Sequence, residues 1–319
     1  MSHTVVCSMK DEGPYIVEWV SWYRMLGFSN ILVLTNDCTD HSVELLDALA
    51  RVGWLTHVAV DVPAGEFPTP FKLAVAKQHR LVTGATWSFL CDVDEFLVLK
   101  GVSLAELLPA DADFIGMSIN WRVFGTGGVQ AWSDGLTHRQ FLRSGGAAHP
   151  TGRWVKSAFR HAQWWKRLGV HAPVKWSGPV PARWVSSSGR DLRGFELAGG
   201  TYRMTERDEI DQSVAQVNHY MMRSAESFAL KQGSMSPVTG KDRYGSRFVT
   251  NFDRNEVEDL SAMVHADAFD AVHAEAMALP DVARLHHLCC ADYLARLAAK
   301  AGGSTKDDPR WQDHIAKAR

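Results

Sequence analysis

The sequence lacks the glycine-rich motifs with which many α/β proteins hold phosphate groups. No G-x-G-x-x-G string follows the first predicted strand, and no P-loop string occurs in the 319 residues. A dinucleotide-binding Rossmann site is therefore disfavoured. A nucleotide bound by this chain must hold its phosphates through a metal ion and side chains instead.

Long apolar runs, a strong net charge and a cysteine framework are also missing. No uninterrupted apolar stretch approaches the roughly 20 residues that span a bilayer, and no N-terminal run resembles a signal peptide. The formal net charge of −2 gives no global attraction to nucleic acid or to membranes. The five cysteines are odd in number and irregularly spaced, which indicates a reducing compartment. We therefore expect a cytoplasmic protein.

The first hundred residues alternate between predicted strands and predicted helices. Apolar runs predict strands at 4–8, 31–34, 54–60 and 87–91, and helical periodicity predicts helices at 14–26, 43–52 and 71–83. This order is typical of an α/β fold with a mostly parallel, Rossmann-like sheet flanked by helices. Ligands of such sheets bind beyond the carboxyl ends of the strands.

The chain changes character near Asp253, where it becomes rich in alanine, leucine and charged residues. We expect one α/β domain over residues 1–250 and a helical C-terminal extension over 251–319 that packs on it. Within the extension, His286-His287 lies close to Cys289-Cys290 and invites interpretation as a zinc site. Adjacent residues on a helix point to different faces, and no second ligand pair supports a metal. A buried stripe of core residues is favoured there, formed by Val282, Leu285, Cys289 and Tyr293.

The sharpest feature of the sequence is a strand that ends in acids. Trp87 to Cys91 are mostly apolar, and Asp92-Val93-Asp94-Glu95 follows at once. Clustered carboxylates at the end of a buried strand cost free energy unless a cation lies between them. Hard oxygen ligands suit Mg²⁺ or Mn²⁺, and such a metal keeps open positions that a diphosphate can fill.

These residues carry a resemblance to a known family. Asp92-Val93-Asp94 resembles the DxD motif of nucleotide-sugar glycosyltransferases with the GT-A fold. The longer Asp-Val-Asp-Glu-Phe string is similar to a group of family-2-like and family-92-like members. Further strings of the chain resemble the same family, namely Lys10-Asp11-Glu12, Asn36-Asp37-Cys38-Thr39-Asp40, Asn120 to Gly128, Lys156-Ser157 and Asn218-His219-Tyr220.

The resemblance implies a function and a set of site residues. The implied reaction transfers a hexose from a UDP- or GDP-sugar to a glycan, lipid-linked or other hydroxyl acceptor, with inversion. The implied metal ligands for Mn²⁺ or Mg²⁺ are Asp92, Asp94 and His219, and the implied acceptor-binding residues are Trp121, Gly127 and Gly128. The implied nucleotide-sugar-binding residues are Lys10, Glu12, Asn36, Asp37, Gln78, Asp92 and Lys156.

The general base is left open by the motifs. Family members often carry a glutamate before an aromatic residue, whereas this chain has Thr137-His138-Arg139-Gln140-Phe141. Asp134 is the favoured base because it is a carboxylate near the glycine-rich loop, and Glu95 and Asp113 are its rivals.

A basic stretch rich in tryptophan runs from Arg139 to Arg207. Such a composition suits a diphosphate, an acidic glycan or an anionic lipid surface, so a peripheral contact at the inner face of the membrane is one expectation. Nucleic acid ranks last, since no RNA-binding motif is present.

Two other classes of function stay open. One is a sugar-nucleotide or carbohydrate-binding pseudoenzyme without turnover. The other is a nucleotidyltransferase, although Met9 to Gly13 supplies little of the glycine-rich, basic loop that such an enzyme needs.

Overall fold

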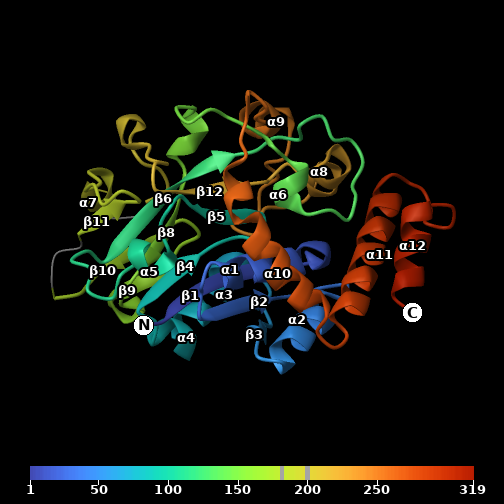
Figure 1. Cartoon of the computed structure of the whole chain (residues 1–319), viewed down its shortest axis with the longest axis horizontal. Helices are drawn as coiled ribbons and strands as arrows, with labels where there is room; N and C mark the ends of the chain where they lie inside the picture. The colour runs from blue at the N-terminus through green and yellow to red at the C-terminus, as the bar shows by residue number, and fades with distance from the viewer. Residues whose placement is uncertain (180–182, 198–201) are drawn as a thin grey trace.

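A computed structural model describes residues 1–179, 183–197 and 202–319. Nine strands of the described chain form one sheet in the order β3-β2-β1-β4-β8-β6-β12-β5, and β11 pairs with β6 beside this path (Figure 1). The strands of this sheet are β1 His3–Met9, β2 Asn30–Thr35, β3 Thr56–Ala59, β4 Trp87–Leu90, β5 Glu95–Leu99, β6 Gly116–Val123, β8 Val155–Phe159, β11 Trp184–Ser186 and β12 Ala215–His219. Two small ribbons pair β7 Arg143–Ser144 with β13 Val257–Glu258, and β9 Trp165–Leu168 with β10 Pro173–Trp176.

The α-helices follow the strands in alternation at first and then gather towards the C-terminus. They are α1 Ile16–Met25, α2 Ser42–Arg51, α3 Pro68–Gln78, α4 Arg80–Thr83, α5 Leu104–Leu107, α6 Thr137–Gln140, α7 Gly194–Leu197, α8 Ala225–Lys231, α9 Ser246–Phe252, α10 Ala266–Met277, α11 Val282–Lys300 and α12 Pro309–Lys317. Among the helices of the described residues, none combines the length and the apolar character that crossing a membrane requires.

Most strands of the sheet run in one direction. β1 pairs in parallel with β2 and β4, β2 with β3, and β6 with β11 and β12, whereas β8 and β5 run antiparallel to their neighbours. Because β8 lies antiparallel between β4 and β6, β6 and β12 point the same way as β1, β2 and β4. The predicted α/β class is confirmed, and the carboxyl ends of these five strands meet at one edge of the sheet.

The sequence placed most early elements within a few residues of their observed bounds. The exception is the single helix predicted over 71–83, which the structure divides into α3 and α4. His79 has an extended backbone, and its side chain accepts a hydrogen bond from the Leu81 amide, so it ends one helix and caps the next.

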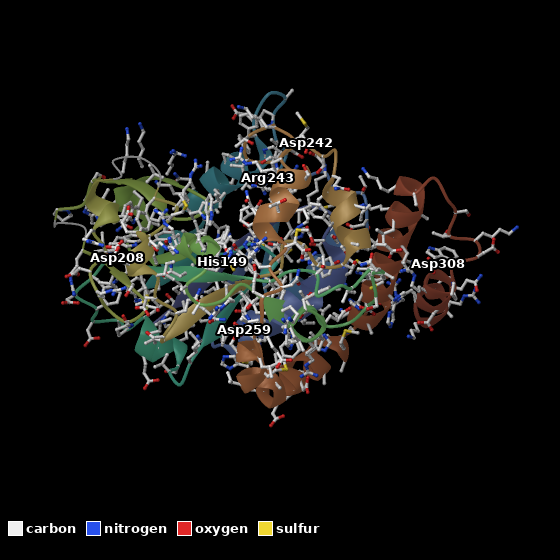
Figure 2. The ribbon with its side chains drawn as sticks, turned by 90° about the horizontal axis from the view of Figure 1, so that it is seen from above. His149, Asp208, Asp242, Arg243, Asp259 and Asp308 are labelled. Carbon is white, nitrogen blue, oxygen red and sulfur yellow. The ribbon has the colours of Figure 1, made fainter. Side chains whose placement is uncertain are left out.

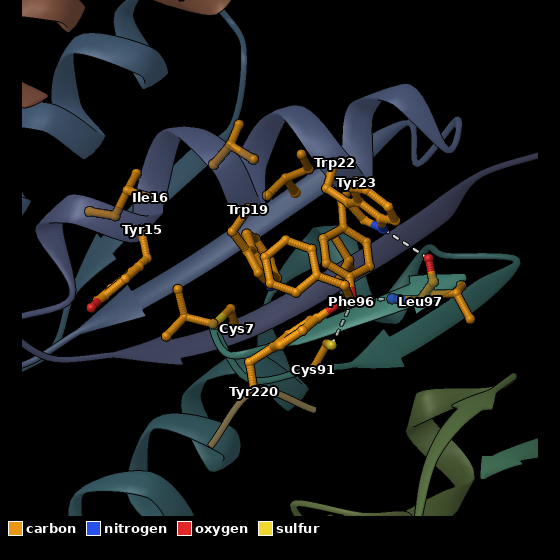
Figure 3. Packing of buried hydrophobic residues seen from close by; sticks show 14 of the residues in the cluster. Cys7, Tyr15, Ile16, Trp19, Trp22, Tyr23, Cys91, Phe96, Leu97 and Tyr220 are labelled. Carbon is orange, nitrogen blue, oxygen red and sulfur yellow. Dashed lines mark hydrogen bonds between the residues drawn. The ribbon is translucent and has the colours of Figure 1, made fainter. Parts of the chain in front are cut away.

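The two faces of the sheet bury different helices. Along β1, Val5 and Cys7 face the larger apolar cluster with α1, α2, α10 and α11, while Val6 faces a second cluster with α3 and α4. Alternation of side chains along a strand explains why neighbouring residues join different layers. Figure 3 shows the larger cluster, in which Trp22 and Tyr23 of α1 donate hydrogen bonds to the backbone carbonyls of Leu97 and Glu95.

The C-terminal helices belong to this larger cluster. Phe269 of α10 is fully buried against Trp22, with ring centroids 5.7 Å apart. The stripe predicted on α11 is confirmed, since Val282, Leu285, Cys289 and Tyr293 are all buried. The core is thus continuous across residue 250, and a division into two domains stays a prediction.

A buried ion pair fastens α1 to the segment that begins α6. Glu18 lies 2.7 Å from His138 Nδ1, and its carboxylate also accepts hydrogen bonds from the Thr137 and His138 amides. Although burial by itself raises the pKa of Glu18, His138 and these hydrogen bonds lower it below its ordinary value. The carboxylate therefore contributes stability in its charged form.

We expect Glu18→Gln to destabilise the fold by about 3 kcal/mol, because it removes the buried carboxylate that accepts hydrogen bonds from the His138 ring and from two backbone amides. The midpoint of urea unfolding measures this loss. Glu44→Gln is the matched control, since Glu44 is an exposed glutamate in the first turn of α2. Equal midpoints for both variants would show that the buried pair contributes nothing.

Candidate active site

A cavity of about 730 Å³ lies at the edge where the carboxyl ends of the parallel strands meet. The loops after β1, β2 and β4 form one side of it, and β6, β12 and the segment from Met235 to Phe252 form the other. Its charged and polar lining includes Lys10, Glu12, Asn36, Asp37, Lys72, Asp92, Asp94, His171, His219, Lys231 and Arg243. This is the position at which parallel α/β sheets bind their ligands.

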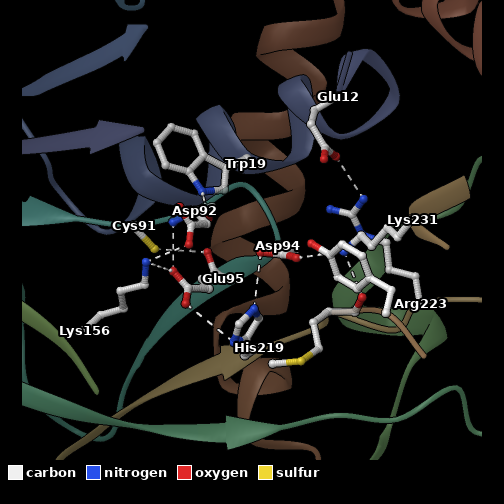
Figure 4. A network of polar contacts seen from close by, with 12 residues as sticks. Glu12, Trp19, Cys91, Asp92, Asp94, Glu95, Lys156, His219, Arg223 and Lys231 are labelled. Carbon is white, nitrogen blue, oxygen red and sulfur yellow. Dashed lines mark hydrogen bonds and ion pairs between the residues drawn. The ribbon is translucent and has the colours of Figure 1, made fainter. Parts of the chain in front are cut away.

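Lys156 lies beneath the floor of the cavity and neutralises two acids. Its ammonium is 2.7 Å from Asp92 Oδ2 and 3.0 Å from Glu95 Oε2, and its side chain is 2% exposed (Figure 4). Glu95 also accepts a hydrogen bond from the Asp92 amide. Lys156 therefore positions the acidic turn from below, rather than facing the cavity as the sequence suggested.

Asp94 and His219 lie together on the cavity wall. His219 Nε2 is 3.4 Å from Asp94 Oδ1, and Lys231 of α8 is 3.2 Å from Asp94 Oδ2. The Tyr220 amide donates to the Asp94 carbonyl, which ties the acidic turn to the end of β12. The string Asn218 to Lys231 thus brings a histidine and a lysine to one aspartate.

Opposite effects act on the two buried acids of this cluster. Burial raises the pKa of Glu95 to about 7, although Lys156 acts in the other direction. Burial also raises the pKa of Asp94, but the charges of Lys231 and His219 outweigh it and hold that pKa well below the usual value. Asp94 is therefore an anion at neutral pH.

The loops after β1 and β2 carry the remaining polar groups. Lys10, Asn36 and Asp37 line the cavity as expected. Asp37 has a φ of 45°, a left-handed conformation that aspartate adopts more readily than most residues. Glu12 pairs with Arg223 at 3.1 Å, and the Arg223 guanidinium lies 3.3 Å from the centre of the Tyr15 ring.

Lys72 of α3 is a cavity residue that the sequence analysis missed. It is 2% exposed, and its ammonium donates to the Met9 carbonyl at 2.9 Å. Burial lowers its pKa to about 8. The predicted Gln78 is exposed at the far end of the same helix, six residues and about 9 Å along the axis from Lys72. The sequence did contain a signal for Lys72. It lies one turn after Pro68, at the start of a helix that the Pro-rich segment predicts.

Aromatic side chains line the cavity beside His219, whose ring centroid lies 4.2 Å from that of Trp121. The Trp121 and Trp154 rings stack with centroids 5.5 Å apart, and His171 lies against both. Burial lowers the pKa of His171 to about 3, so its ring is neutral. Arg243, which Figure 2 labels, and Tyr244 also line the cavity, from the segment before α9. Flat apolar faces of this kind suit sugar rings.

The glycine-rich loop does not reach the cavity. The Thr126 and Gly127 amides donate to the side chains of Asp253 and Asn255. A Cβ at Gly125 would lie 2.4 Å from the Asn255 side chain, so the glycine permits close approach to the chain's own C-terminal part. The structure brings Trp121 to the site, but not Gly127 or Gly128.

None of the three carboxylates considered as general base lines the cavity. Asp134 pairs with His286 at 3.0 Å, and its pKa falls to about 2 because His286 outweighs the effect of burial. Asp113 pairs with Arg183 on the surface. Glu95 is fully buried beneath the site. The sequence could not foresee the helix that pairs with Asp134, because that helix lies 152 residues further along.

The residues fit a divalent cation in part. Among the described residues, the groups of three donors within 4.8 Å of one another do not include Asp92, Asp94 and His219. Asp94 and His219 are close enough to share an ion, whereas the Asp92 carboxylate is engaged by Lys156. Mg²⁺ and Mn²⁺ are often held by only one or two protein side chains, with substrate phosphates completing the shell.

The basic, tryptophan-rich stretch is divided among several environments. Arg183 and Arg193 form surface ion pairs, and Trp165 and Trp184 are buried in the second cluster. Trp164, Lys166 and Arg167 stay exposed around β9. The stretch includes residues 180–182 and 198–201, which lie outside the described chain.

No family model matches the chain, and no curated protein is detectably similar to it. Solved structures show a weak similarity in fold. Residues 1–349 of TarS from S. aureus align over 100% of this chain and 88% of their own, with a TM-score of 0.37 and 11% identity. The same fragment in complex with UDP-GlcNAc aligns over the same shares, with a TM-score of 0.36 and 11% identity. The galactosyltransferase LgtC, in complex with donor and acceptor sugar analogues, aligns over 50% of this chain and 59% of its own, with a TM-score of 0.30 and 14% identity. Similarity at this level carries no argument about function, which must be argued from the residues of this chain.

Proposed function

We propose that this protein is a GT-A-type glycosyltransferase that moves a hexose from a UDP- or GDP-sugar to a hydroxyl acceptor. The observation that carries the proposal is the cavity at the carboxyl edge of the sheet. It gathers an acidic turn, a histidine, several basic groups and an aromatic wall, which are the groups that a nucleotide sugar needs. Inversion of the sugar is the stereochemical outcome that the sequence resemblance implies.

Different side chains of the cavity would bind the nucleoside and the diphosphate of the donor. Lys10, Asn36 and Asp37 would bind the nucleoside, because amide and carboxylate groups at the end of β2 suit base and ribose hydroxyls. The diphosphate would lie in the part of the cavity lined by Asp94, Lys72 and Lys231, whose two ammonium groups are its counter-charges. Without a glycine-rich loop, these side chains carry the recognition of phosphate.

Departure of the nucleoside diphosphate needs positive charge at the phosphates. Lys231 and Lys72 supply part of it and are held in place by the Met221 and Met9 carbonyls. When bound at Asp94 and His219, Mn²⁺ or Mg²⁺ would add further charge stabilisation to the leaving group. Lys156 holds Asp92 and Glu95 from below and so keeps the turn in one conformation.

The acceptor would enter along the aromatic wall. Trp121 and Trp154 offer a stacked aromatic surface beside His219, which suits the apolar face of a sugar ring. Besides Asp92 and Asp94, the described carboxylates that line the cavity are Glu12 and Asp37.

The test is a thermal-shift panel of UDP-, GDP-, CMP- and dTDP-sugars with Mn²⁺, followed by an assay for release of the nucleoside diphosphate. A donor at 100 times its dissociation constant should stabilise the protein by about 2.7 kcal/mol. We expect a UDP- or GDP-sugar to give the largest shift, and Mn²⁺ with an acceptor to give turnover.

The same assay separates the other classes of function. Binding of a nucleotide sugar without release of the nucleoside diphosphate under any acceptor would identify a pseudoenzyme. Release of pyrophosphate from a nucleoside triphosphate would identify a nucleotidyltransferase. No shift with any nucleotide sugar would overturn the proposal.

A further inference from the structure

The C-terminal helices carry a second cluster of ligand-type side chains, far from the acidic turn in sequence. It combines Asp134 from the loop after β6 with His286, His287 and Cys290 of α11 and His314 of α12. Two overlapping triplets, Asp134 with Cys290 and His314, and Asp134 with His286 and His287, have donor atoms within 4.8 Å of one another. The sequence alone disfavoured a metal here because the partners of α11 were not visible.

Several donor pairs in the cluster lie close enough to share one ion. His286 Nε2 lies 3.0 and 3.2 Å from the two Asp134 oxygens and 3.6 Å from Cys290 Sγ. His287 Nδ1 lies 3.1 Å from His314 Nδ1. Bonds of 2.0–2.3 Å in a tetrahedral zinc site place neighbouring donors about 3.3–3.8 Å apart. The separations of His286 from Asp134 and from Cys290 are near that spacing, and His314 lies within 4.8 Å of Asp134 and Cys290.

Burial and the kinds of donor atom also suit a metal. Cys290 and His314 are buried, and the His286 side chain is 9% exposed. The shell mixes nitrogen, sulfur and oxygen donors, which favours zinc over magnesium or calcium.

We propose that Asp134, His286, Cys290 and His314 form a structural Zn²⁺ site that fastens the α11–α12 hairpin to the loop after β6. Cys290 binds as a thiolate, and its proton passes to solvent when the ion enters. His287 hydrogen-bonds to His314 and orients its ring. The hairpin is already joined to this loop by Arg310, which pairs with Glu226 at 2.9 Å and donates to the Trp132 carbonyl. Figure 1 shows α11 and α12 side by side at one end of the molecule.

The experiment measures Zn²⁺ binding by the full chain, purified without a metal-binding tag. The protein is stripped with a chelator and equilibrated with Zn²⁺ by dialysis, and its metal content is measured by mass spectrometry. We expect one tightly held Zn²⁺ per chain. Cys290→Ala and His314→Ala should each weaken Zn²⁺ binding by more than about tenfold. Loss of a residue that only hydrogen-bonds to a ligand already costs about that much, and loss of a ligand should cost more.

Cys289→Ala is the matched control. Cys289 is the neighbouring buried thiol, but it packs against Gly13 on another face of α11. This variant should bind Zn²⁺ as the wild type does. Equal loss of binding in Cys289→Ala and Cys290→Ala would overturn the proposal, as would a wild type that binds no more Zn²⁺ than the Cys290→Ala/His314→Ala double variant.

Co²⁺ provides a measurement that needs no variant. In the wild type, Co²⁺ bound by Cys290 should give the thiolate-to-metal absorption band in the near ultraviolet and the visible bands of a tetrahedral ion. A wild-type spectrum without a thiolate band would exclude Cys290 as a ligand even if its variants fail to fold. Neither measurement depends on transferase activity, so the zinc proposal and the proposed function can fail separately.

Discussion

Replacing Lys156 by methionine is expected to destabilise the protein by about 3–5 kcal/mol, because it leaves buried acid without a counter-charge. The Lys156 ammonium neutralises Asp92 and Glu95 at 2.7 and 3.0 Å, and the Glu95 side chain is fully buried. Methionine has a similar length, so the change removes the charge while leaving most of the packing. The loss should appear as a lower urea midpoint with an unchanged slope.

The double variant Lys156→Met/Glu95→Gln separates charge from packing. It makes the Glu95 side chain neutral at every pH, so it should recover the part of the Lys156→Met loss that comes from a charge on Glu95. Lys166→Met is the matched control, since Lys166 is exposed on β9 and should leave the midpoint unchanged. A Lys156→Met variant as stable as this control would mean that the ion pair under the acidic turn is not formed.

Asp94→Asn is expected to abolish the Mn²⁺-dependent part of donor binding and to lower kcat by about 10²–10³-fold. The change keeps the shape of the side chain but removes the charge that lies beside His219 and Lys231. Loss of an anion at the proposed ion site weakens the cation and the stabilisation of the leaving group together. Thermal shifts with and without Mn²⁺, and release of the nucleoside diphosphate, measure the two effects.

Asp113→Asn is the control for this prediction. Asp113 is 81% exposed in its side chain and pairs with Arg183 away from the cavity. It should leave donor binding and turnover unchanged. An Asp94→Asn enzyme that keeps its Mn²⁺-dependent shift would show that the acidic turn does not hold the ion.

Local sequence patterns predicted the fold well where one segment decides its own structure. Ser103 and Glu106 have the spacing of a capping box, and this box forms at the start of α5, while Ser224 caps α8. The helix predicted over 71–83 was wrong in one detail, because the periodic pattern runs through His79 although the backbone there is extended. The sequence did not show that β8 and β5 each run antiparallel to their neighbours in the sheet. Those neighbours are strands far apart in sequence, so no local pattern reveals the direction of pairing.

The candidate site was also predicted only in part, because some of its residues are placed by local sequence and others by long-range packing. Loops that directly follow predicted strands supplied Lys10, Asn36, Asp37, Asp92 and Asp94, and all five line the cavity. Gly127 and Gly128 look like a ligand loop, but their segment is held by Asp253 and Asn255. Lys72 was missed because only the packing of α3 against the end of β1 shows that it is buried and close to the Met9 carbonyl.

The sequence by itself determined which residues end the parallel strands and therefore which polar groups meet at one edge of the sheet. That follows from the period of apolar residues and from the rule that parallel strands share the direction of their carboxyl ends. Only the tertiary structure decided which partner each charged group has. Lys156 lies under Asp92, and His286 and His314 lie beside Asp134, because packing brings together segments up to 180 residues apart, which no local pattern encodes.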